Sequence, residues 1–584
     1  MESEGVLLMY QDMYERWLAA ELDDADLKPE LESVKGDDAA IQDRFAVALK
    51  FGTAGLRGVI GAGTNRMNIY VVRRATQGLA NYIIKQGAAN KGVAIAYDSR
   101  HMSPEFAMEA AMTLAANGIK AYKFESLRPT PELSFAVREL GCVAGINITA
   151  SHNPPEYNGY KVYWEDGAQF TPPHDKGVTE EVLAIEDLST VKTTDEASAT
   201  AAGLYQVIGQ EIDDKYIAQV KAQVVNQKAI DEMQDQITIV YTPLHGTGNI
   251  PARRVMKEIG FTHVYVVPEQ ELPDGDFPTV SYPNPEAKEA FELGLKLAKE
   301  KDADLVLATD PDADRLGVYV KDTKSGEYIP LTGNMSGSLL CEYVLSQKQA
   351  AGKIPADGQV VKSIVSTNLI DAVAKSYGAE LIEVLTGFKW IGKQILKNET
   401  TGHGTYLFGM EESYGCLIGT YARDKDAISA TAALCEAAAY YKQKGMTLWD
   451  AMIAMYEKYG YYKDAVKAIG LSGIEGLAKI QSIMETLRNN TPTEVGGYKV
   501  TSARDYKLDT IKDMATGEVK PTGLPSSNVL YYDLEDGAWI CVRPSGTEPK
   551  IKFYFGVKGT SLEDAEEKEN ALGAAVMAMV DKMM

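Results

Sequence analysis

The sequence contains little cysteine and little histidine. Its 584 residues include five cysteines, none in a CxxC pair, and six histidines that do not cluster. Disulfide frameworks need dense, even cysteines, and structural zinc sites need closely spaced thiolate or imidazole ligands. The composition therefore suggests neither a disulfide scaffold nor a thiolate zinc site.

Long apolar runs and basic residues are also scarce. No uninterrupted apolar stretch approaches the roughly 20 residues of a membrane-spanning helix, and the first residues, MESEGVLLMYQDMYERW, lack the basic start of a signal peptide. Lysine and arginine total 59 against 82 acidic residues, which gives a formal net charge of −23. Such a charge repels nucleic acid and anionic membranes. We therefore expect a cytoplasmic protein that binds neither.

The pattern of apolar segments indicates several domains. The chain is too long for one hydrophobic core. Short apolar strands alternate with amphipathic helices in three blocks, which begin near residues 93, 237 and 358. This alternation is typical of βαβ units with a mostly parallel sheet. Beyond about residue 460, a helix is followed by strands and an Asp536-Gly537 hairpin signal.

The predicted fold class is α/β, with three similar α/β domains that contain mixed, mostly parallel sheets and a C-terminal α+β domain. Polar stretches at 189–203 and near 445–465 are the predicted linkers. The predicted units are an N-terminal extension of one or two helices at 1–45, α/β domains at 46–203, 204–325 and 326–455, and the α+β domain at 456–584.

A triple-aspartate loop carries the strongest single signal. Asp310, Asp312 and Asp314 follow the apolar segment LVLAT. Carboxylates at alternate positions repel one another unless they share a cation, and oxygen ligands favour Mg²⁺, Ca²⁺ or Mn²⁺. An EF-hand does not fit, because Arg315 stands where that loop needs glycine and Lys321 where it needs glutamate. The sequence predicts a metal loop of another kind.

A second loop presents a serine. The segment 149–155, TASHNPP, places Ser151 at the end of an apolar strand and before a rigid Asn-Pro-Pro turn. Proline fixes the backbone, which suits a presented nucleophile. Serine and asparagine also satisfy backbone groups in ordinary turns. Taken alone, this loop is compatible with both interpretations.

Two further loops combine hydrogen-bonding and cationic groups. In GMEESYG (409–415), acids and a serine between glycines suit sugar hydroxyls, although a plain loop would look similar. In RPSGTEPK (543–550), arginine and two hydroxyls form a candidate anion site, since arginine binds phosphate bidentately. Arg57 and Lys389 each place one cation in a glycine-flanked loop.

Together and in this order, these segments resemble the α-D-phosphohexomutase superfamily, in particular its phosphoglucomutase/phosphomannomutase family. That family has a phosphoserine loop, a triple-aspartate metal loop, a sugar-specificity loop and a C-terminal phosphate loop. All four occur here between residues 149 and 550. The resemblance therefore covers nearly the whole chain, and it implies four domains around a central cleft.

The resemblance also implies roles for individual residues. Ser151 would carry the phosphoryl group, and Asp310, Asp312 and Asp314 would hold Mg²⁺ together with a phosphoserine oxygen. The supporting cations would be Arg57, His152, Lys161, Arg315 and Lys389, with Lys389 favoured over His152 as general base. The substrate would be bound by Glu411 and Ser413 at its hydroxyls and by Arg543, Ser545, Gly546 and Thr547 at its non-reacting phosphate.

The reaction implied is the interconversion of glucose 1-phosphate and glucose 6-phosphate, with phosphosugars as partners and glucose 1,6-bisphosphate as activator. The EESYG sequence of the sugar loop looks like the glucose-preferring branch. The TPLHGTG segment (242–248) also resembles phosphopentomutases and glucose-1,6-bisphosphate synthases. Those activities and phosphomannomutase therefore stay open, and the chain is expected to be a monomer or a dimer.

Two other classes compete with a mutase. A phosphatase of the alkaline type also combines serine, metal and arginine, but it needs more metal ligands, typically histidines, and those do not cluster here. A non-catalytic sugar-phosphate sensor would keep the phosphate loop and lose the chemistry. The intact Ser151 and the three aspartates argue against it.

Overall fold

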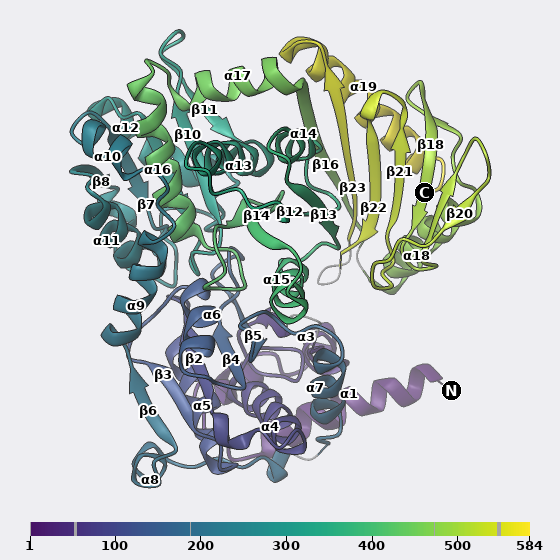
Figure 1. Cartoon of the computed structure of the whole chain (residues 1–584). Helices are drawn as coiled ribbons and strands as arrows, with labels where there is room; N and C mark the ends of the chain where they lie inside the picture. The colour runs from purple at the N-terminus through teal and green to yellow at the C-terminus, as the bar shows by residue number, and fades with distance from the viewer. Residues whose placement is uncertain (1, 52–54, 187, 472, 546–549) are drawn as a thin grey trace.

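The computed structural model describes residues 2–51, 55–186, 188–471, 473–545 and 550–584. Within them the chain forms four sheets that follow one another along the sequence. The first three contain parallel and antiparallel pairs and carry helices, whereas the fourth is antiparallel throughout. In Figure 1 the first sheet lies at the bottom and the fourth at the upper right. The predicted fold class is confirmed.

Three helices precede the first sheet, where the sequence predicted one or two. Gly36 adopts φ +85° after the second of them, and the Asp37 carboxylate accepts a hydrogen bond from the Ala40 N–H to begin the third. The break between the second and the third helix therefore has a local cause, a left-handed glycine followed by an aspartate that caps the next helix. Their shared core includes Trp17 and Phe45. The helices are α1 (Glu2–Ala19), α2 (Leu27–Ser33) and α3 (Asp38–Phe45).

The first sheet has the order β1-β5-β4-β2-β3-β6. All residues of β2 and β4 are buried, as expected for strands in the middle of a helix-covered sheet. Strand β6 pairs with β3 although it lies beyond the predicted limit at residue 203, so we propose that this domain extends to residue 208. The strands are β1 (Gly55–Val59), β2 (Val93–Tyr97), β3 (Ala121–Phe124), β4 (Ala144–Ile148), β5 (Tyr157–Trp164) and β6 (Tyr205–Ile208).

The second and third sheets have the orders β11-β10-β9-β7-β8 and β13-β12-β14-β15. Strand β11 pairs with β10 beyond the predicted limit at residue 325, so we propose that the second domain extends to residue 331. The strands of the second sheet are β7 (Thr238–Thr242), β8 (His263–Val266), β9 (Leu305–Thr309), β10 (Leu316–Lys321) and β11 (Tyr328–Leu331). Those of the third are β12 (Gly358–Ser363), β13 (Glu380–Val384), β14 (Thr405–Glu411) and β15 (Gly415–Leu417).

Side-chain caps set where several connecting helices begin. Asn68 caps α4 through the Val71 N–H, and Asp426 caps α16 through the N–H groups of Ile428 and Ser429. The longer helices are α4 (Ile69–Lys85), α5 (Ser103–Ala116), α6 (Thr130–Glu139), α7 (His174–Leu183), α9 (Gln210–Lys221), α11 (Asn249–Ile259), α12 (Glu292–Lys301), α13 (Gly333–Ala350), α14 (Leu369–Ser376), α15 (Lys389–Thr401), α16 (Ala427–Gln443) and α17 (Leu448–Tyr459).

The fourth sheet begins earlier than predicted. The linker expected near 445–465 is wrong, because helix α17 and strand β16 occupy it, and the predicted limit at 455/456 falls inside α17. Strand β16 pairs with β23 at the sheet edge, where its partial exposure weakens the apolar alternation that marks a strand. The hairpin at Asp536-Gly537 is confirmed by antiparallel pairing of β21 with β22.

The strands of the fourth sheet are β16 (Tyr461–Gly470), β17 (Glu494–Val495), β18 (Tyr498–Asp505), β19 (Thr510–Asp513), β20 (Val519–Lys520), β21 (Leu530–Leu534), β22 (Trp539–Pro544) and β23 (Lys550–Gly559). Helices α18 (Gly473–Asn489) and α19 (Leu562–Asp581) accompany them.

Shared cores join the domains. One cluster of buried apolar residues runs through the first three domains, and a smaller cluster joins Ile364, Val365 and Leu385 of the third to Tyr531 and Trp539 of the fourth. The domains therefore hold the strand-end loops of different sheets in fixed relation. Across the part of the chain that the structure describes, no helix has the length and apolarity needed to cross a bilayer.

Candidate active site

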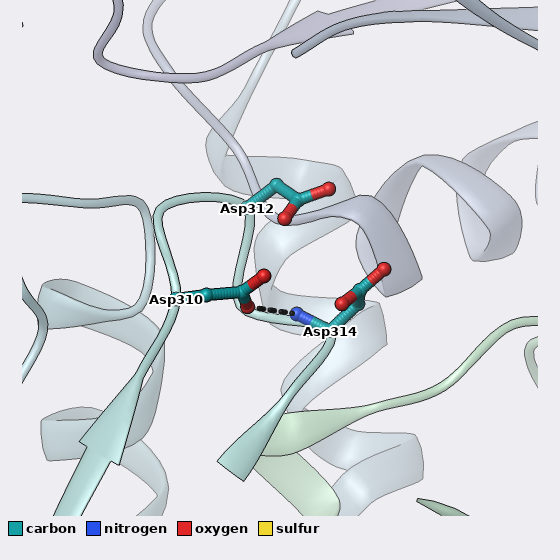
Figure 2. A group of neighbouring side chains, drawn as sticks. All are labelled: Asp310, Asp312 and Asp314. Atoms are coloured by element: carbon teal, nitrogen blue, oxygen red, sulfur yellow. Dashed lines mark hydrogen bonds between the residues drawn. The ribbon is translucent and has the colours of Figure 1, made fainter. Parts of the chain in front are cut away.

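The triple-aspartate loop follows β9 and is buried. Asp310, Asp312 and Asp314 are at most 2% exposed, and an oxygen from each lies within 4.8 Å of the others. Asp310 Oδ1 accepts a 3.1 Å hydrogen bond from the Asp314 N–H (Figure 2). It accepts a second bond of 3.1 Å from the Arg315 N–H. The loop thus turns around Asp310 and gathers the three carboxylates.

The carboxylate donors fit a divalent cation. The Oδ1 atoms of Asp312 and Asp314 are buried and accept no hydrogen bond from any described residue. Burial and the other two carboxylates raise the pKa of Asp310 well above its ordinary value. Buried, unsatisfied oxygens are costly, and a cluster of oxygen donors alone selects a hard ion such as Mg²⁺. The residues present therefore suit such an ion.

Ser151 reaches this loop from the first domain. It follows β4 with φ +52°, a conformation uncommon for residues other than glycine and often found at functional sites. Its side-chain Oγ donates a 2.7 Å hydrogen bond to Asp310 Oδ2, and its N–H donates to Thr149 Oγ1 at 2.8 Å. The structure therefore brings the predicted nucleophile and the predicted metal loop together.

Arg100, which the sequence analysis missed, holds the serine loop in place. Its buried guanidinium donates to the backbone carbonyls of Ser151, Asn153, Pro154 and Tyr157. Arginine can satisfy several acceptors with one rigid fork, so a single side chain fixes the loop at four points. The signal in the sequence was the polar segment directly after strand β2, at the same carboxyl edge of the sheet.

Two predicted cations lie beside Ser151. His152 Nδ1 is 3.2 Å from Ser151 Oγ, and an Arg57 guanidinium N–H donates to Asn153 Oδ1 at 3.1 Å. Burial, together with the positive charges of Arg315 and Arg57, lowers the pKa of His152 well below its ordinary value. This shift favours the neutral imidazole.

Asp312 is held mainly by the first domain. Lys161 Nζ on β5 lies 2.6 Å from Asp312 Oδ2, and Thr130 Oγ1 donates to the same oxygen at 2.7 Å. Asn147 Nδ2 in turn donates to Thr130 Oγ1 at 2.7 Å. Against the opposing effect of burial, Lys161 keeps the pKa of Asp312 below its ordinary value. Thr130 and Asn147 were not predicted from the sequence.

The third domain also contributes a cation that the sequence analysis missed. Lys425 Nζ lies 3.2 Å from Asp314 Oδ2 and 3.1 Å from Asp424 Oδ1. The Tyr163 hydroxyl of the first domain donates to Asp424 Oδ2 at 2.9 Å. Although burial opposes it, the two carboxylates raise the pKa of Lys425 above its ordinary value. Three domains therefore meet at the metal loop.

The sugar loop lies close to these charges. Glu411, at the end of β14, is buried and accepts a 2.7 Å hydrogen bond from the Gly387 N–H. Its negative charge is among those that raise the pKa values of Arg315 and Lys425. Arg315 also pairs with Glu286 at 2.9 Å. The half-buried Ser413 occupies the turn after Glu411.

Glu412 links the sugar loop to the fourth domain. Burial and the charge of Glu411 raise the pKa of Glu412 to about 7, while Arg543 on β22 opposes this rise. The Ser363 hydroxyl donates to Glu412 Oε2 at 3.1 Å. Arg543 of the predicted phosphate loop is therefore near enough to the sugar loop for its charge to act on Glu412.

Ser545 and Lys389 are the remaining predicted positions among the described residues. The Ser545 N–H donates to the Lys550 carbonyl at 2.7 Å, while Gly546 and Thr547 lie outside the described residues. Lys389 is the first residue of α15. Burial lowers its pKa, and the charge of Lys393 adds to this effect, whereas Asp175 of the first domain opposes it.

Comparisons with known proteins identify the four domains. The phosphoglucomutase/phosphomannomutase alpha/beta/alpha domains I, II and III match residues 48–189, 214–326 and 332–459, and the C-terminal domain of the same family matches 497–572. Phosphoglucomutases of Staphylococcus saprophyticus and Staphylococcus aureus are each 36% identical, over 90% and 92% of this chain and 94% of their own length.

Solved structures show the same fold at lower identity. The open form of the Paramecium phosphoglucomutase pp63/parafusin has a TM-score of 0.67 at 19% identity and covers 92% of this chain and 95% of its own. A phosphoglucomutase/phosphomannomutase family protein of Burkholderia thailandensis has a TM-score of 0.64 at 20% identity, over 90% and 97%. Three α/β domains and a C-terminal domain in this order define a phosphohexomutase, an enzyme that transfers a phosphoryl group within a sugar phosphate. The chain belongs to the phosphoglucomutase/phosphomannomutase family.

Proposed function

We propose that this enzyme interconverts glucose 1-phosphate and glucose 6-phosphate through a phosphorylated Ser151. The observation that carries the chemistry is the contact between Ser151 Oγ and Asp310 Oδ2, which places a hydroxyl nucleophile at a carboxylate loop suited to a cation. The choice of glucose rests on the two staphylococcal phosphoglucomutases and on the EESYG sequence of the sugar loop.

In this proposal the protein positions the phosphoryl group and balances its charge. Phosphoryl transfer depends mainly on alignment and electrostatic stabilisation. Arg100 fixes the backbone of the serine loop, and Arg57, His152 and Lys161 surround it. The covalent phosphoserine divides the exchange into two in-line transfers, from enzyme to sugar and back.

Asp310, Asp312 and Asp314 would hold Mg²⁺, with the Ser151 oxygen completing the site. When bound, the ion would neutralise negative charge that develops on the transferring group. Lys161 and Lys425 contact Asp312 and Asp314 from two other domains, so they would hold the carboxylates in position for the ion.

Substrate recognition is proposed at two places. Glu411 and Ser413 would bind sugar hydroxyls, and Arg543 and Ser545, together with Gly546 and Thr547, would bind the phosphate that is not reacting. The phosphate-binding loop with Arg543 and Ser545, here called the phosphate clamp, would be separate from Ser151. The bisphosphate intermediate can then turn end for end, because the clamp accepts either of its phosphates. Glucose 1,6-bisphosphate would act as activator by reloading Ser151.

For the general base we propose Lys389, with His152 as the alternative. A lysine base needs a lowered pKa, and burial lowers that of Lys389. His152 is adjacent to Ser151, and its lowered pKa favours the neutral imidazole, so it would accept the proton that the Ser151 hydroxyl loses when it takes up the phosphoryl group.

We place the reaction in the cytoplasm, since all five cysteines are buried and unpaired, as is usual in reducing compartments.

A substrate panel tests the proposed specificity. Glucose 1-phosphate, mannose 1-phosphate, glucosamine 1-phosphate and ribose 1-phosphate are each supplied with Mg²⁺ and a trace of the matching bisphosphate. We expect the highest kcat/KM with glucose 1-phosphate. A higher value with ribose 1-phosphate would assign a phosphopentomutase, and a higher value with mannose 1-phosphate a phosphomannomutase.

A further inference from the structure

The TPLHGTG segment (242–248), which the proposed reaction does not use, lies against the metal loop. Its Thr247 N–H donates a 2.8 Å hydrogen bond to the Pro311 carbonyl, and Pro311 stands between two of the metal-loop aspartates. A Cβ atom on Gly246 would lie 2.4 Å from Pro311 Cα, so only glycine allows this approach. The segment therefore sets the position of the metal-loop backbone.

Two consecutive residues of this segment have an unfavourable backbone conformation. Leu244 has φ +46° and His245 has φ +59°, both in the left-handed region that favours glycine. This region is a rare outlier for a bulky side chain such as leucine. Such a backbone persists only where the surrounding contacts enforce it, and functional sites collect it.

His245 provides contacts of this kind and is only 3% exposed. Its backbone N–H donates to the Gln270 carbonyl at 3.0 Å, and its side-chain Nδ1 donates to the Leu272 carbonyl at 3.1 Å. Because a carbonyl can only accept, Nδ1 carries a proton, and Nε2 lies 2.9 Å from Thr279 Oγ1. Residues 268–279 are therefore attached to His245 near both of their ends.

The same residues also reach the serine loop, through Phe277. Phe277 is fully buried, and the guanidinium carbon of the buried Arg100 lies 5.0 Å from its ring centroid. A cation over an aromatic ring is attracted more strongly when both groups are desolvated. Beside this contact, His101 Nε2 lies 2.7 Å from Asp276 Oδ1. Because Arg100 holds four carbonyls of the serine loop, Phe277 contacts the side chain that fixes that loop.

We propose that residues 268–279, here called the bracket, fix the spacing between the metal loop and the serine loop, with His245 and Phe277 as positioning residues. His245 acts through the backbone of Pro311, and Phe277 acts through Arg100. The two loops belong to different domains, and a misplacement of about 1 Å can cost about a hundredfold in rate. This role rests on the proposed phosphoserine reaction.

Hydrogen exchange of the full-length enzyme tests the bracket without relying on turnover. His245→Leu should speed amide exchange in 310–316, and Phe277→Leu in 149–158, because each variant removes one attachment. The matched control is Phe261→Leu, which also shortens a buried side chain of the second domain. Phe261 precedes the amino end of β8, opposite the strand ends that carry the site, so exchange in both segments should stay as in the wild type.

Steady-state kinetics and calorimetry test the role of the bracket in the reaction. With glucose 1-phosphate at saturating Mg²⁺, His245→Leu and Phe277→Leu should lower kcat between about tenfold and a hundredfold. KM should stay within about twofold, because the phosphate clamp is untouched. His245→Leu should also raise the dissociation constant of Mg²⁺ measured by calorimetry, whereas Phe261→Leu should lower the thermal midpoint alone.

His245→Asn separates positioning from general loss of structure. Asparagine tolerates the left-handed backbone and keeps an N–H donor near the place of Nδ1, so it should recover most of the kcat that His245→Leu loses. Unchanged exchange in both segments, a kcat in both variants equal to that of Phe261→Leu, or a raised KM at unchanged kcat would each overturn the bracket. A wild type that turned over no sugar phosphate would contradict the proposed reaction instead, and the exchange and Mg²⁺ results would then decide whether the bracket holds the two loops.

Discussion

Ser151 Oγ and Asp310 Oδ2 lie 2.7 Å apart, although 159 residues separate them in the chain. This hydrogen bond joins the strand-end loops of two different sheets. Because both side chains are buried, the relation depends on how the first and second domains pack and not on a flexible surface contact. The site therefore forms only when these two domains are correctly assembled.

Removing the metal should abolish activity. We expect EDTA to inactivate the enzyme and Mg²⁺ to restore it, because the loop offers oxygen ligands alone. Asp312→Ala should behave like metal-free enzyme at ordinary Mg²⁺ concentrations, and a Mg²⁺ titration of turnover checks this. Full activity of Asp312→Ala without added metal would remove the metal role from this loop.

Loss of Lys425 should lower the stability and the turnover of the enzyme more than loss of a lysine in a partly exposed ion pair. Lys425→Met removes the nearest cation of Asp314, at 3.2 Å, and leaves Lys161 at 3.6 Å. Breaking a buried pair typically costs about 3–5 kcal/mol, and because Lys161 remains we expect a loss at the lower end of that range. The matched control is Lys442→Met, which removes a 2.7 Å pair with Asp304 that is partly exposed and should cost below about 1 kcal/mol. Thermal midpoints and kcat are measured for both. Equal effects in the two variants would contradict a special role for Lys425.

Glu412 should make stability depend on pH near neutrality. Its pKa of about 7 lies above the value of a solvated glutamate, so the folded state keeps a proton that the unfolded state has lost. The stability this contributes is present at low pH and is lost as the pH rises through about 7. Glu412→Gln stays neutral at every pH. Its free energy of unfolding, relative to that of the wild type, should therefore rise by about 1–3 kcal/mol between about pH 5 and pH 8.

Thermal midpoints across that range test the expectation for Glu412. The exposed Glu457→Gln serves as the control, and its difference from the wild type should stay constant. If the difference in thermal midpoint between Glu412→Gln and the wild type were also constant, Glu412 would already be ionised in the folded protein at low pH, and the prediction would be wrong.

Arg543 should affect substrate affinity first. If it holds the non-reacting phosphate, it binds ground state and transition state alike, so Arg543→Ala should raise KM for glucose 1-phosphate, by about tenfold or more. A fall in kcat as well would indicate that closure of the fourth domain depends on this contact. Steady-state kinetics at saturating Mg²⁺ separate the two effects, and an unchanged KM would exclude Arg543 from the clamp.

The sequence predicted the parts of the site that are local. Asp310, Asp312 and Asp314 lie within five residues, and Ser151 follows an apolar strand, so a short window contains the whole pattern. The three α/β blocks were recognisable for the same reason, because each strand and helix carries its own periodicity.

What the sequence could not predict depends on contacts between distant segments. Arg100 acts through the carbonyls of a loop about fifty residues away, a pattern that leaves no mark in the chain next to it. Lys425 and Thr130 reach the metal loop only because three domains meet there. Strand β16 was missed because, as an edge strand, it is partly exposed along most of its length.

The central claim is that Ser151 carries a phosphoryl group that returns to sugar and not to water. The direct measurement is intact-protein mass spectrometry combined with a single reaction mixture in which glucose 6-phosphate and inorganic phosphate are both quantified. We expect a species one phosphoryl group heavier that maps to the Ser151 peptide and is absent from Ser151→Ala. We also expect conversion of glucose 1-phosphate to glucose 6-phosphate with almost no free phosphate. Stoichiometric release of inorganic phosphate by the wild type would contradict this claim and identify a phosphatase.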